Sequence, residues 1–286
     1  TRILVEPIEW SHYGDTLLKF FLFFQDDLIL TMERHMTQLI KAIFIATFSF
    51  FFSLNTFADG HEQPSFIPLE GFACNYAPGK DMDDLLQVTK TWNDYMDDGG
   101  SKYSAWLFTP YFYSEDEVAD VFWIGVSPTW EELAKGEQHM SAPKGQKINA
   151  QFNKVVPCYD HTNWGYESVR SSSGSSDDDE GVVTIMWCTL AEGVTYEDVL
   201  AADEKFNAYE DSAGSATGVG RWWPGSGIPS RFTADFLWAQ GVDSMQSWGQ
   251  SVDRAVNGGG NQATLAIYGE LMSCDNRAVY KVKSVR

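Results

Sequence analysis

Basic residues are scarce in this sequence. Its 286 residues include 20 Lys and Arg against 40 Asp and Glu, which gives a formal net charge of −20 at pH 7. Such an excess of negative charge repels nucleic acids and anionic membrane surfaces. We therefore exclude a nucleic-acid partner and expect an acidic, soluble protein.

Motifs for metal binding and catalysis are lacking as well. No spacing of His, Cys and Asp matches a zinc or calcium template, and no Ser lies in a nucleophile elbow. No glycine-rich loop for phosphate is present, and Gly225, Ser226 and Gly227 indicate only a loop. The sequence thus predicts no metal site and no cofactor.

The sequence lacks a comfortable membrane span. The apolar run at residues 42–54 is shorter than the roughly 20 residues that a spanning helix needs. It follows Lys41 and precedes Thr56 and Ala58, which is the order found in secretory signals. We predict a signal peptide at residues 36–58 rather than an N-terminal anchor. The mature protein would be periplasmic or secreted, without membrane contact after cleavage.

Residues 1–35 precede this signal. They begin with Thr and mix apolar runs with acidic residues in no clean period. We interpret them as a non-native upstream extension, the alternative being a real but poorly ordered segment.

One stretch of the sequence occurs twice. Residues 74–97 superpose on residues 188–211 at a constant offset of 114 (188 minus 74), with identical Cys, Gly, Asp, Leu, Asn and Tyr positions. The same offset carries Phe122 onto Phe236, and an offset of 116 carries Cys158 onto Cys274. This pattern indicates an internal duplication.

Cysteine is rare, with four residues, all after the predicted signal. An even number of Cys in an exported chain indicates disulfides, and four Cys allow three pairings. The duplication favours one pairing within each repeat: Cys74 with Cys158, and Cys188 with Cys274. Bonds that close such long loops contribute about 4 kcal/mol in the chain-entropy model.

Each repeat has the predicted order β-α-β-β-α-β. In the first, a strand ends at Cys74, a helix begins after Asp81, and the remaining elements are strands at 103–113 and 118–126, a helix from Ser127 and a strand at 155–158. In the second, the helix begins after Thr195, and the remaining elements are strands at 219–223 and 234–238, a helix from Asp243 and a strand at 264–274. Met245, Trp248, Val252 and Val256 are expected to form the buried side of that last helix.

This order predicts an α+β fold of two ferredoxin-like repeats, at 65–170 and 182–286, joined by an acidic Ser/Gly linker at 171–181. In such a unit the first and last strands are neighbours, which agrees with the Cys pairing. Two such units resemble a fused version of the dimeric α/β-barrel superfamily, and we expect a monomer that forms an intramolecular barrel. Short pieces of sequence such as Cys74-Asn75-Tyr76 are also similar to uncharacterised secreted proteins of marine bacteria, a similarity that implies no activity.

The sequence offers few candidates for catalysis. His139 and His161 occur only in the first repeat, and a surface or hydrogen-bonded histidine is the simpler interpretation of His161. Dimeric α/β-barrel proteins include cofactor-free monooxygenases and haem-degrading enzymes, and the resemblance implies a site of Asn, Trp and His. Asn75, Trp130 and His139 fall in roughly comparable elements, and coincidence is the favoured explanation.

Aromatic residues are dense, and several Trp lie on or beside predicted strands. Most should belong to the core. Some could line a pocket between sheet and helices, and we select Trp106, Trp123, Trp222 and Trp238 for ligand binding. Asn93 and Asn207 add a matched polar group, which could equally be a satisfied helix-end residue.

Three functions remain open. The leading hypothesis is an exported protein that binds a small aromatic or carbohydrate-like molecule in aromatic-lined cavities. The second is a cofactor-independent, monooxygenase-like barrel enzyme that uses residues of the first repeat. The third is a protein-interaction module that presents an acidic surface.

Overall fold

The computed structural model describes residues 65–114, 119–173 and 180–286. The described residues all belong to one compact unit. The predicted upstream extension and signal peptide lie outside the described residues, as do residues 174–179 of the predicted linker.

The described part is α+β, with fourteen elements that fall into two halves of seven in the same order. In the first half these are β1 (Ile67–Cys74), α2 (Met82–Asp98), β2 (Ser104–Phe112), β3 (Val121–Val126), α3 (Trp130–Met140), α4 (Pro143–Val155) and β4 (Cys158–Arg170). In the second half they are β5 (Glu180–Leu190), α5 (Tyr196–Ser212), β6 (Gly218–Pro224), β7 (Phe236–Val242), α6 (Met245–Val256), α7 (Gly260–Tyr268) and β8 (Met272–Ser284).

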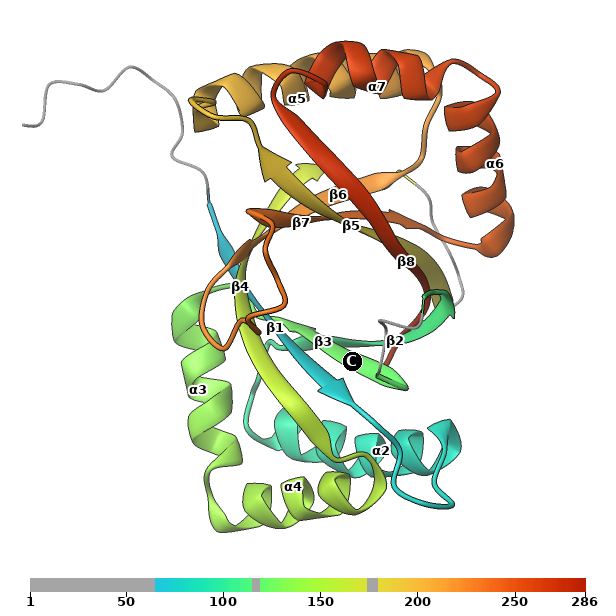
Figure 1. Cartoon of the computed structure of the whole chain (residues 1–286). Helices are drawn as coiled ribbons and strands as arrows, with labels where there is room; N and C mark the ends of the chain where they lie inside the picture. The colour runs from blue at the N-terminus through green and yellow to red at the C-terminus, as the bar shows by residue number, and fades with distance from the viewer. Residues whose placement is uncertain (1–64, 115–118, 174–179) are drawn as a thin grey trace, which may run out of the picture. The chain divides into compact units, whose positions relative to one another are not determined.

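The eight strands form one closed antiparallel barrel in the order β1-β3-β2-β8-β5-β7-β6-β4. Strands of one half are neighbours, and the halves meet where β2 pairs with β8 and β4 pairs with β6. Helices α2, α3 and α4 lie outside the barrel on one side, and α5, α6 and α7 lie on the opposite side (Figure 1). The outer faces of the sheet are therefore covered by helices, and the inner faces enclose the barrel interior.

The helix that follows the first Cys of each half, α2 or α5, begins where the sequence predicted. The Asp81 carboxylate accepts hydrogen bonds from the backbone amides of Asp83 and Asp84, as an N-cap does. Thr195 and Asp198 form a reciprocal capping box at the start of α5.

The structure confirms both predicted disulfides. Cys74 is bonded to Cys158 and Cys188 to Cys274. Cys74 lies directly opposite Cys158 in the β1–β4 pair, and Cys188 lies opposite Cys274 in the β5–β8 pair. The pairing follows from the first and last strands of each half being neighbours.

The second helix of each repeat was predicted as one helix, and this prediction is wrong. The segment forms two helices in each half, α3 and α4 in the first and α6 and α7 in the second. Gly145 and Gly260 stand where the two helices meet, and a Cβ on either would lie within 3 Å of backbone atoms of the preceding helix. The close approach of the chain at this corner requires glycine.

The predicted last strands are also wrong in their bounds. Val155 ends α4, and the strand begins only at Cys158, because Pro157 cannot continue a helix. In the second half, residues 264–268 belong to α7, and the strand begins at Met272.

The side of α6 that was predicted to be buried is not. Val252 is 38% exposed and Val256 58% exposed, and α6 has no buried residue. Trp248, Val252 and Val256 line a pocket instead of packing tightly against the sheet. An apolar helix face that borders a cavity has the same sequence pattern as one that is buried.

The sequence alignment that paired Phe122 with Phe236 is wrong by one residue. Cys74 lies opposite Val121, and Cys188 lies opposite Phe236. Phe236 therefore corresponds to Val121 rather than to Phe122, and Trp238 corresponds to Trp123. The extra residue falls between β6 and β7.

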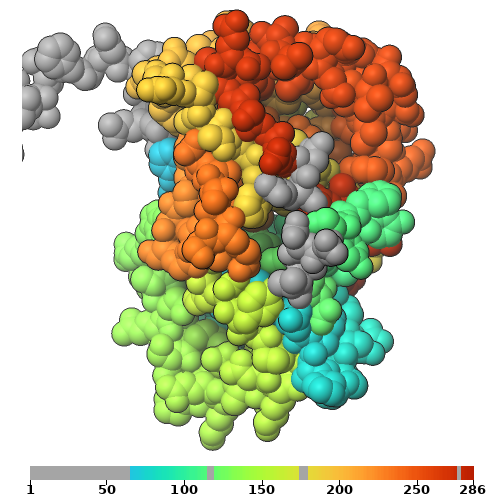
Figure 2. Space-filling model, viewed as in Figure 1, coloured from blue at the N-terminus to red at the C-terminus, as the bar shows by residue number. Residues whose placement is uncertain are grey.

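The loop between β6 and β7, residues 225–235, closes one end of the barrel. The ring of Phe232 contacts Trp164 and Trp187 at centroid distances of 5.2 and 5.0 Å. The loop is held by Asn163, whose backbone donates to Ser226 O and accepts from Gly225 N. Figure 2 shows this orange segment lying against the yellow-green strand β4.

Candidate functional site

A pocket of about 420 Å³ lies between the outer face of the first-half sheet and the three helices of that half. We call it the first-half pocket. The helices contribute residues such as Leu85, Leu133 and Phe152, and β1 contributes Glu70 and Phe72. Alternate residues of a strand point to opposite faces, so Glu70, Phe72 and Cys74 face the helices together.

Glu70 is the most deeply placed charge of this pocket, with only 5% of its surface exposed. Its Oε1 accepts a hydrogen bond of 2.5 Å from the Tyr103 hydroxyl. Its Oε2 lies 3.4 Å from Nε2 of His161. A carboxylate that is removed from water needs such partners, and both of its oxygens have one.

Tyr103 connects Glu70 to the aromatic wall. Its hydroxyl accepts a hydrogen bond of 3.2 Å from Nε1 of Trp123. Burial raises the pKa of Tyr103 well above its ordinary value, and the Glu70 carboxylate raises it further, so the hydroxyl keeps its proton. Gly125 makes room for this group, because a Cβ there would lie 1.5 Å from the Tyr103 oxygen.

His161 is a predicted candidate that does lie in the pocket. It extends from β4, and its imidazole stacks on Phe72 with a centroid distance of 3.9 Å and an interplanar angle of 15°. The hydrogen bond to Glu70 raises the pKa of His161 above its ordinary value. Its side chain is half exposed, so it stands between the buried carboxylate and solvent.

Glu137 brings a second carboxyl to the same end. It lies on α3 and lines the pocket. Partial burial raises its pKa, and the nearby Glu70 carboxylate raises it further. The pocket thus has a polar end with two carboxyl groups and one imidazole.

Most of the remaining wall is aromatic and apolar, with Asn149, Asn153 and Asp160 as further polar lining residues. The indole of Trp123 meets that of Trp92 edge-on at a centroid distance of 4.9 Å and meets Phe152 at 5.6 Å. Such edge-to-face contacts fix ring positions. An apolar molecule would therefore bind to a pocket whose walls are already in place.

The structure does not bring Asn75, Trp130 and His139 together. Oδ1 of Asn75 accepts from the Asp120 amide, and Nε1 of the half-exposed Trp130 donates to Phe66 O. His139 stacks on Tyr95 and contacts Tyr95 O at 3.0 Å. None of the three lines the first-half pocket. The site implied by the resemblance to haem-degrading enzymes is therefore not assembled.

The four selected Trp residues lie in three different places. Trp123 lines the first-half pocket, and Trp238 lines a pocket in the second half. Trp106 and Trp222 face the interior of the barrel. They cannot contact one common ligand.

Asn93 and Asn207 fasten strands to helices and line neither helix-covered pocket. Nδ2 of Asn93 donates to Val285 O at 2.6 Å, and Nδ2 of Asn207 donates to Val169 O at 2.9 Å. Oδ1 of each is buried without a hydrogen-bond partner among the described residues.

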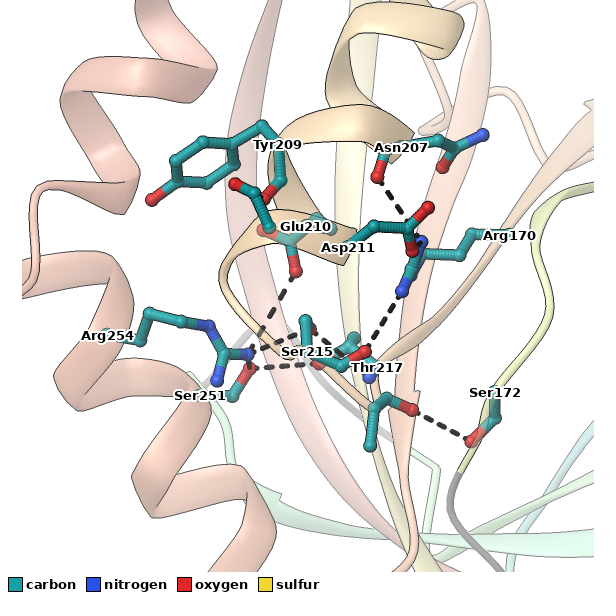
Figure 3. Close-up of polar contacts among 12 residues, drawn as sticks. Arg170, Ser172, Asn207, Tyr209, Glu210, Asp211, Ser215, Thr217, Ser251 and Arg254 are labelled. Carbon is teal, nitrogen blue, oxygen red and sulfur yellow. Dashed lines mark hydrogen bonds and ion pairs between the residues drawn. The ribbon is translucent and has the colours of Figure 1, made fainter.

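An Arg follows each Val, Val169 and Val285, whose carbonyl accepts one of these hydrogen bonds. Arg170 contacts Asp211 at 2.6 Å and Ser215 O at 3.0 Å, as Figure 3 shows. Arg286 repeats the arrangement with Asp97 at 2.7 Å and Ser101 O at 3.0 Å. The last strand of each half is thereby fixed to the first helix of the other half.

The second half has a pocket of about 730 Å³ in the corresponding place. Thr184, four residues before Cys188, stands where Glu70 stands in the first half, and Thr217 replaces Tyr103. Arg254 reaches in from α6 and contacts Ser215 Oγ at 2.9 Å, Ser251 Oγ at 3.2 Å and the Glu210 carboxylate at 4.0 Å (Figure 3). Each half therefore has a pocket in the corresponding place, but the polar residues that line the two pockets differ.

A buried charge network joins β4 of the first half to α5, β6 and α7 of the second half. Arg221, which is fully buried, donates to Glu167 at 3.0 and 3.1 Å and to Asp203 at 3.2 Å. Tyr268 donates to Asp203 at 2.7 Å, and Trp223 donates to Glu167 at 2.9 Å. Every charge has partners inside the fold, so we assign this network to structure rather than to a site.

Glu70, Tyr103 and Glu137 were not selected from the sequence. A signal for Glu70 exists, because it is the one charged residue of β1, IPLEGFAC. Tyr103 and Glu137 gave no signal, because an aromatic residue at the start of a strand and an acid on a helix are ordinary.

Within the described ranges, no group of three or more His, Cys, Asp or Glu is placed to hold a metal ion. Among the helices of those ranges, none has both the length and the apolar character needed to cross a membrane.

Comparison with known proteins gives no family. No family model matches the sequence, and no curated protein matches it. The solved structures that resemble the fold include chlorite dismutase from Candidatus Nitrospira defluvii in complex with imidazole, at 8% identity over 78% of this chain and 93% of that one, with a TM-score of 0.46. A haem-binding protein from Thermus thermophilus has 8% identity over 78% of this chain and 95% of that one, with a TM-score of 0.45.

A dye-decolorizing peroxidase from Bacteroides thetaiotaomicron has 7% identity over 79% of this chain and 94% of that one, with a TM-score of 0.46. At such values the likeness says nothing about the activity of this chain.

Proposed function

We propose that the two halves are ferredoxin-like repeats, residues 65–170 and 182–286, that arose by internal duplication. Their seven elements recur in the same order, and each half has its own disulfide between first and last strand. The contacts of Asn93 and Arg286 recur at Asn207 and Arg170. Independent origins would not repeat the same side-chain contacts at corresponding positions of the two halves.

We propose that the protein binds a small, mainly apolar molecule with a cationic or hydrogen-bond-donating group in the first-half pocket. One observation carries this proposal: the buried Glu70 carboxylate closes an aromatic pocket of about 420 Å³. Pockets for small molecules are mostly apolar, with a few polar groups that fix orientation.

The charges at the polar end favour a cation. Glu70 and Glu137 can contribute two negative charges, against one positive charge on a protonated His161. The third carboxylate of the lining, Asp160, is paired with Arg231 at 2.6 Å. Opposite charges attract strongly in a site of low dielectric, and an anion there would lack compensation. Burial is the main cause of the raised pKa of Glu137, and the nearby Glu70 carboxylate raises this pKa further, because the ionised form of Glu137 lies near another negative charge. A bound cation would relieve that repulsion.

A matched pair of probes tests this proposal by calorimetry on the oxidised protein. 2-Phenylethylamine and phenylacetate have the same ring and similar length but opposite charge at neutral pH. We expect the amine to bind about tenfold or more tightly than the acid, because of the net negative polar end. Equal affinities, or tighter binding of phenylacetate, would contradict the proposal.

Two carboxylates of one helix provide the matched control. Glu137 lines the pocket, whereas the side chain of Glu131 is 79% exposed and pairs with Lys135. Glu137→Gln should weaken binding of 2-phenylethylamine several-fold, and Glu131→Gln should leave it unchanged. Equal effects of the two variants would mean that only the overall charge of the protein matters.

Acid–base catalysis at the same residues is a second candidate. The observation that favours it is a carboxyl of raised pKa, Glu137, close to an imidazole of raised pKa, His161. Groups that titrate nearer to neutrality are suited to proton transfer. Phenylacetone in D₂O is a suitable probe: faster loss of its α-protons with wild type, but not with His161→Ala, would favour an enzyme. If wild type does not accelerate the exchange over buffer alone, the protein is a binding protein rather than an enzyme for this reaction.

We further propose that the mature protein is exported and acts as a monomer. The two disulfides support an oxidising compartment. The barrel closes with strands from one chain, so both halves satisfy their sheet edges without a second copy. No membrane or nucleic-acid partner is part of this proposal.

A further inference from the structure

A cavity of about 670 Å³ lies inside the barrel, at the end where β4 finishes and β5 begins. All eight strands contribute to its wall, and it shares no residue with the first-half pocket. We call it the barrel cavity. The opposite end of the barrel is closed by the loop that carries Phe232.

Four glycines of the second half line this space. Gly220 lies opposite Ala239, Gly218 opposite Gly241, and Gly181 opposite Val282. Ala239 and Val282 belong to the core inside the barrel, and paired residues point to the same face of a sheet. Gly181, Gly218, Gly220 and Gly241 therefore all face inward.

The first half has side chains at the same positions. Ile67, Ser104, Trp106 and Val126 correspond to Gly181, Gly218, Gly220 and Gly241 through offsets of 114 (181 minus 67) and, on β7, 115 (241 minus 126). The interior of an eight-stranded barrel is just wide enough to be filled by side chains or to hold one small ligand. Glycine inside a strand weakens the strand and marks places where a ligand approaches the backbone. The second half contributes no side chain at these four positions. Tyr166 lies beside Gly220 and Ser172 beside Gly218, whereas only Val183 lies near Gly241.

The wall of the cavity determines what could occupy it. Trp106, Phe108, Tyr166 and Trp222 give it flat aromatic surfaces. Trp222 is 7% exposed, and its indole N–H has no acceptor among the described residues. The charged residues of the wall, Arg170, Glu180 and Asp243, are of both signs. Arg170 is paired with Asp211 and Glu180 with Lys283, so the wall favours a neutral molecule over an ion of either sign.

We propose that the barrel cavity is a second ligand site, which takes a neutral, flat, two- or three-ring molecule that carries a hydrogen-bond acceptor. The rings would lie against the aromatic wall, and the acceptor would pair with the buried donor of Trp222. This site is independent of the proposed function of the first-half pocket.

Prodan, a neutral naphthalene with one ketone, is the probe, because its emission shifts to the blue in apolar surroundings. The same change, Gly to Leu, made at one glycine of each cavity distinguishes binding at the two sites. A Cβ on Gly241 would meet Val183 at 3.6 Å, and a Cβ on Gly136 in the first-half pocket would meet Met96 at 3.7 Å. Both are ordinary contacts, so Gly241→Leu and Gly136→Leu each fill one cavity without a backbone clash.

Wild type should bind prodan with a blue shift. Gly241→Leu should weaken that binding about tenfold or more, and Gly241→Val should weaken it less, in keeping with the volume added. Gly136→Leu should leave prodan unaffected while it abolishes binding of 2-phenylethylamine. Circular dichroism checks that each variant is folded, and Gly241→Val replaces Gly241→Leu if the larger side chain prevents folding.

Absence of blue-shifted binding to wild type would overturn the proposal. So would an unchanged affinity in folded Gly241 variants, or a loss in Gly136→Leu alone, which would place prodan in the first-half pocket. The parallel titration with 2-phenylethylamine reports on the first-half pocket separately, so failure of one site is not mistaken for failure of the other.

Discussion

Glu70 is the residue on which the first-half pocket depends. It anchors Tyr103 on one oxygen and faces His161 on the other, and Tyr103 in turn holds Trp123. Sequence reasoning selected His161 and Trp123 from rarity and aromaticity. It did not select Glu70, because the chemistry of a carboxylate depends on burial, and the strand pairing that buries Glu70 is not visible in the residues around it.

The contact of Glu70 with His161 predicts a pH-dependent stability. The pKa of His161 is raised above 6.5 in the folded protein, so the folded state binds this proton more tightly than the unfolded chain. The stabilisation is fully present below pH 6.5 and is lost as the pH rises through the folded-state pKa. We expect the melting temperature of wild type to exceed that of His161→Gln most at low pH.

The difference should be modest, because the His161 side chain is half exposed and solvent screens the pair. Thermal unfolding of both proteins at a series of pH values measures it. A difference that stays constant or grows as the pH rises would refute the ion pair.

At the scale of elements, the sequence was most informative about helices and strands with clear boundaries. The N-caps Asp81 and Thr195 and the strands that end at Cys74 and near Val126 lie where expected. The corner between α3 and α4 was missed, because it depends on a close backbone approach at Gly145. The exposed side of α6 was missed, because a cavity and a packed core select the same apolar residues.

The two Asn residues predict an effect on stability without an effect on binding. Asn93→Ala and Asn207→Ala each remove a hydrogen bond that ties a strand of one half to a helix of the other. We expect the unfolding free energy of each variant to fall by about 1 kcal/mol. The loss is no larger because the substitution also removes the buried Oδ1 that has no hydrogen-bond partner among the described residues.

Urea denaturation measures this loss, and calorimetry with 2-phenylethylamine checks that affinity is kept. Weaker binding without loss of stability would instead make these residues part of a ligand site, as one interpretation of the sequence held.

At the scale of the whole molecule, the two halves differ within one closed barrel. The first half has an acidic, aromatic pocket, whereas the second half has Thr184 and Thr217 at the positions of Glu70 and Tyr103 and has four glycines that face the barrel interior. The proposed duplication could be inferred from the sequence, because it rests on residue identities at nearly constant offsets. The differences between the pockets could not, because they depend on which residues face the helices and which face the barrel interior.

The most direct test of the account is a crystal structure of the oxidised protein grown with 2-phenylethylamine. We predict that the ring lies against Trp123 and Trp92 and that the ammonium group is within hydrogen-bonding distance of Glu70 or Glu137. Density for the amine elsewhere, with the first-half pocket empty, would contradict the central claim that this pocket is a binding site for a cationic aromatic molecule.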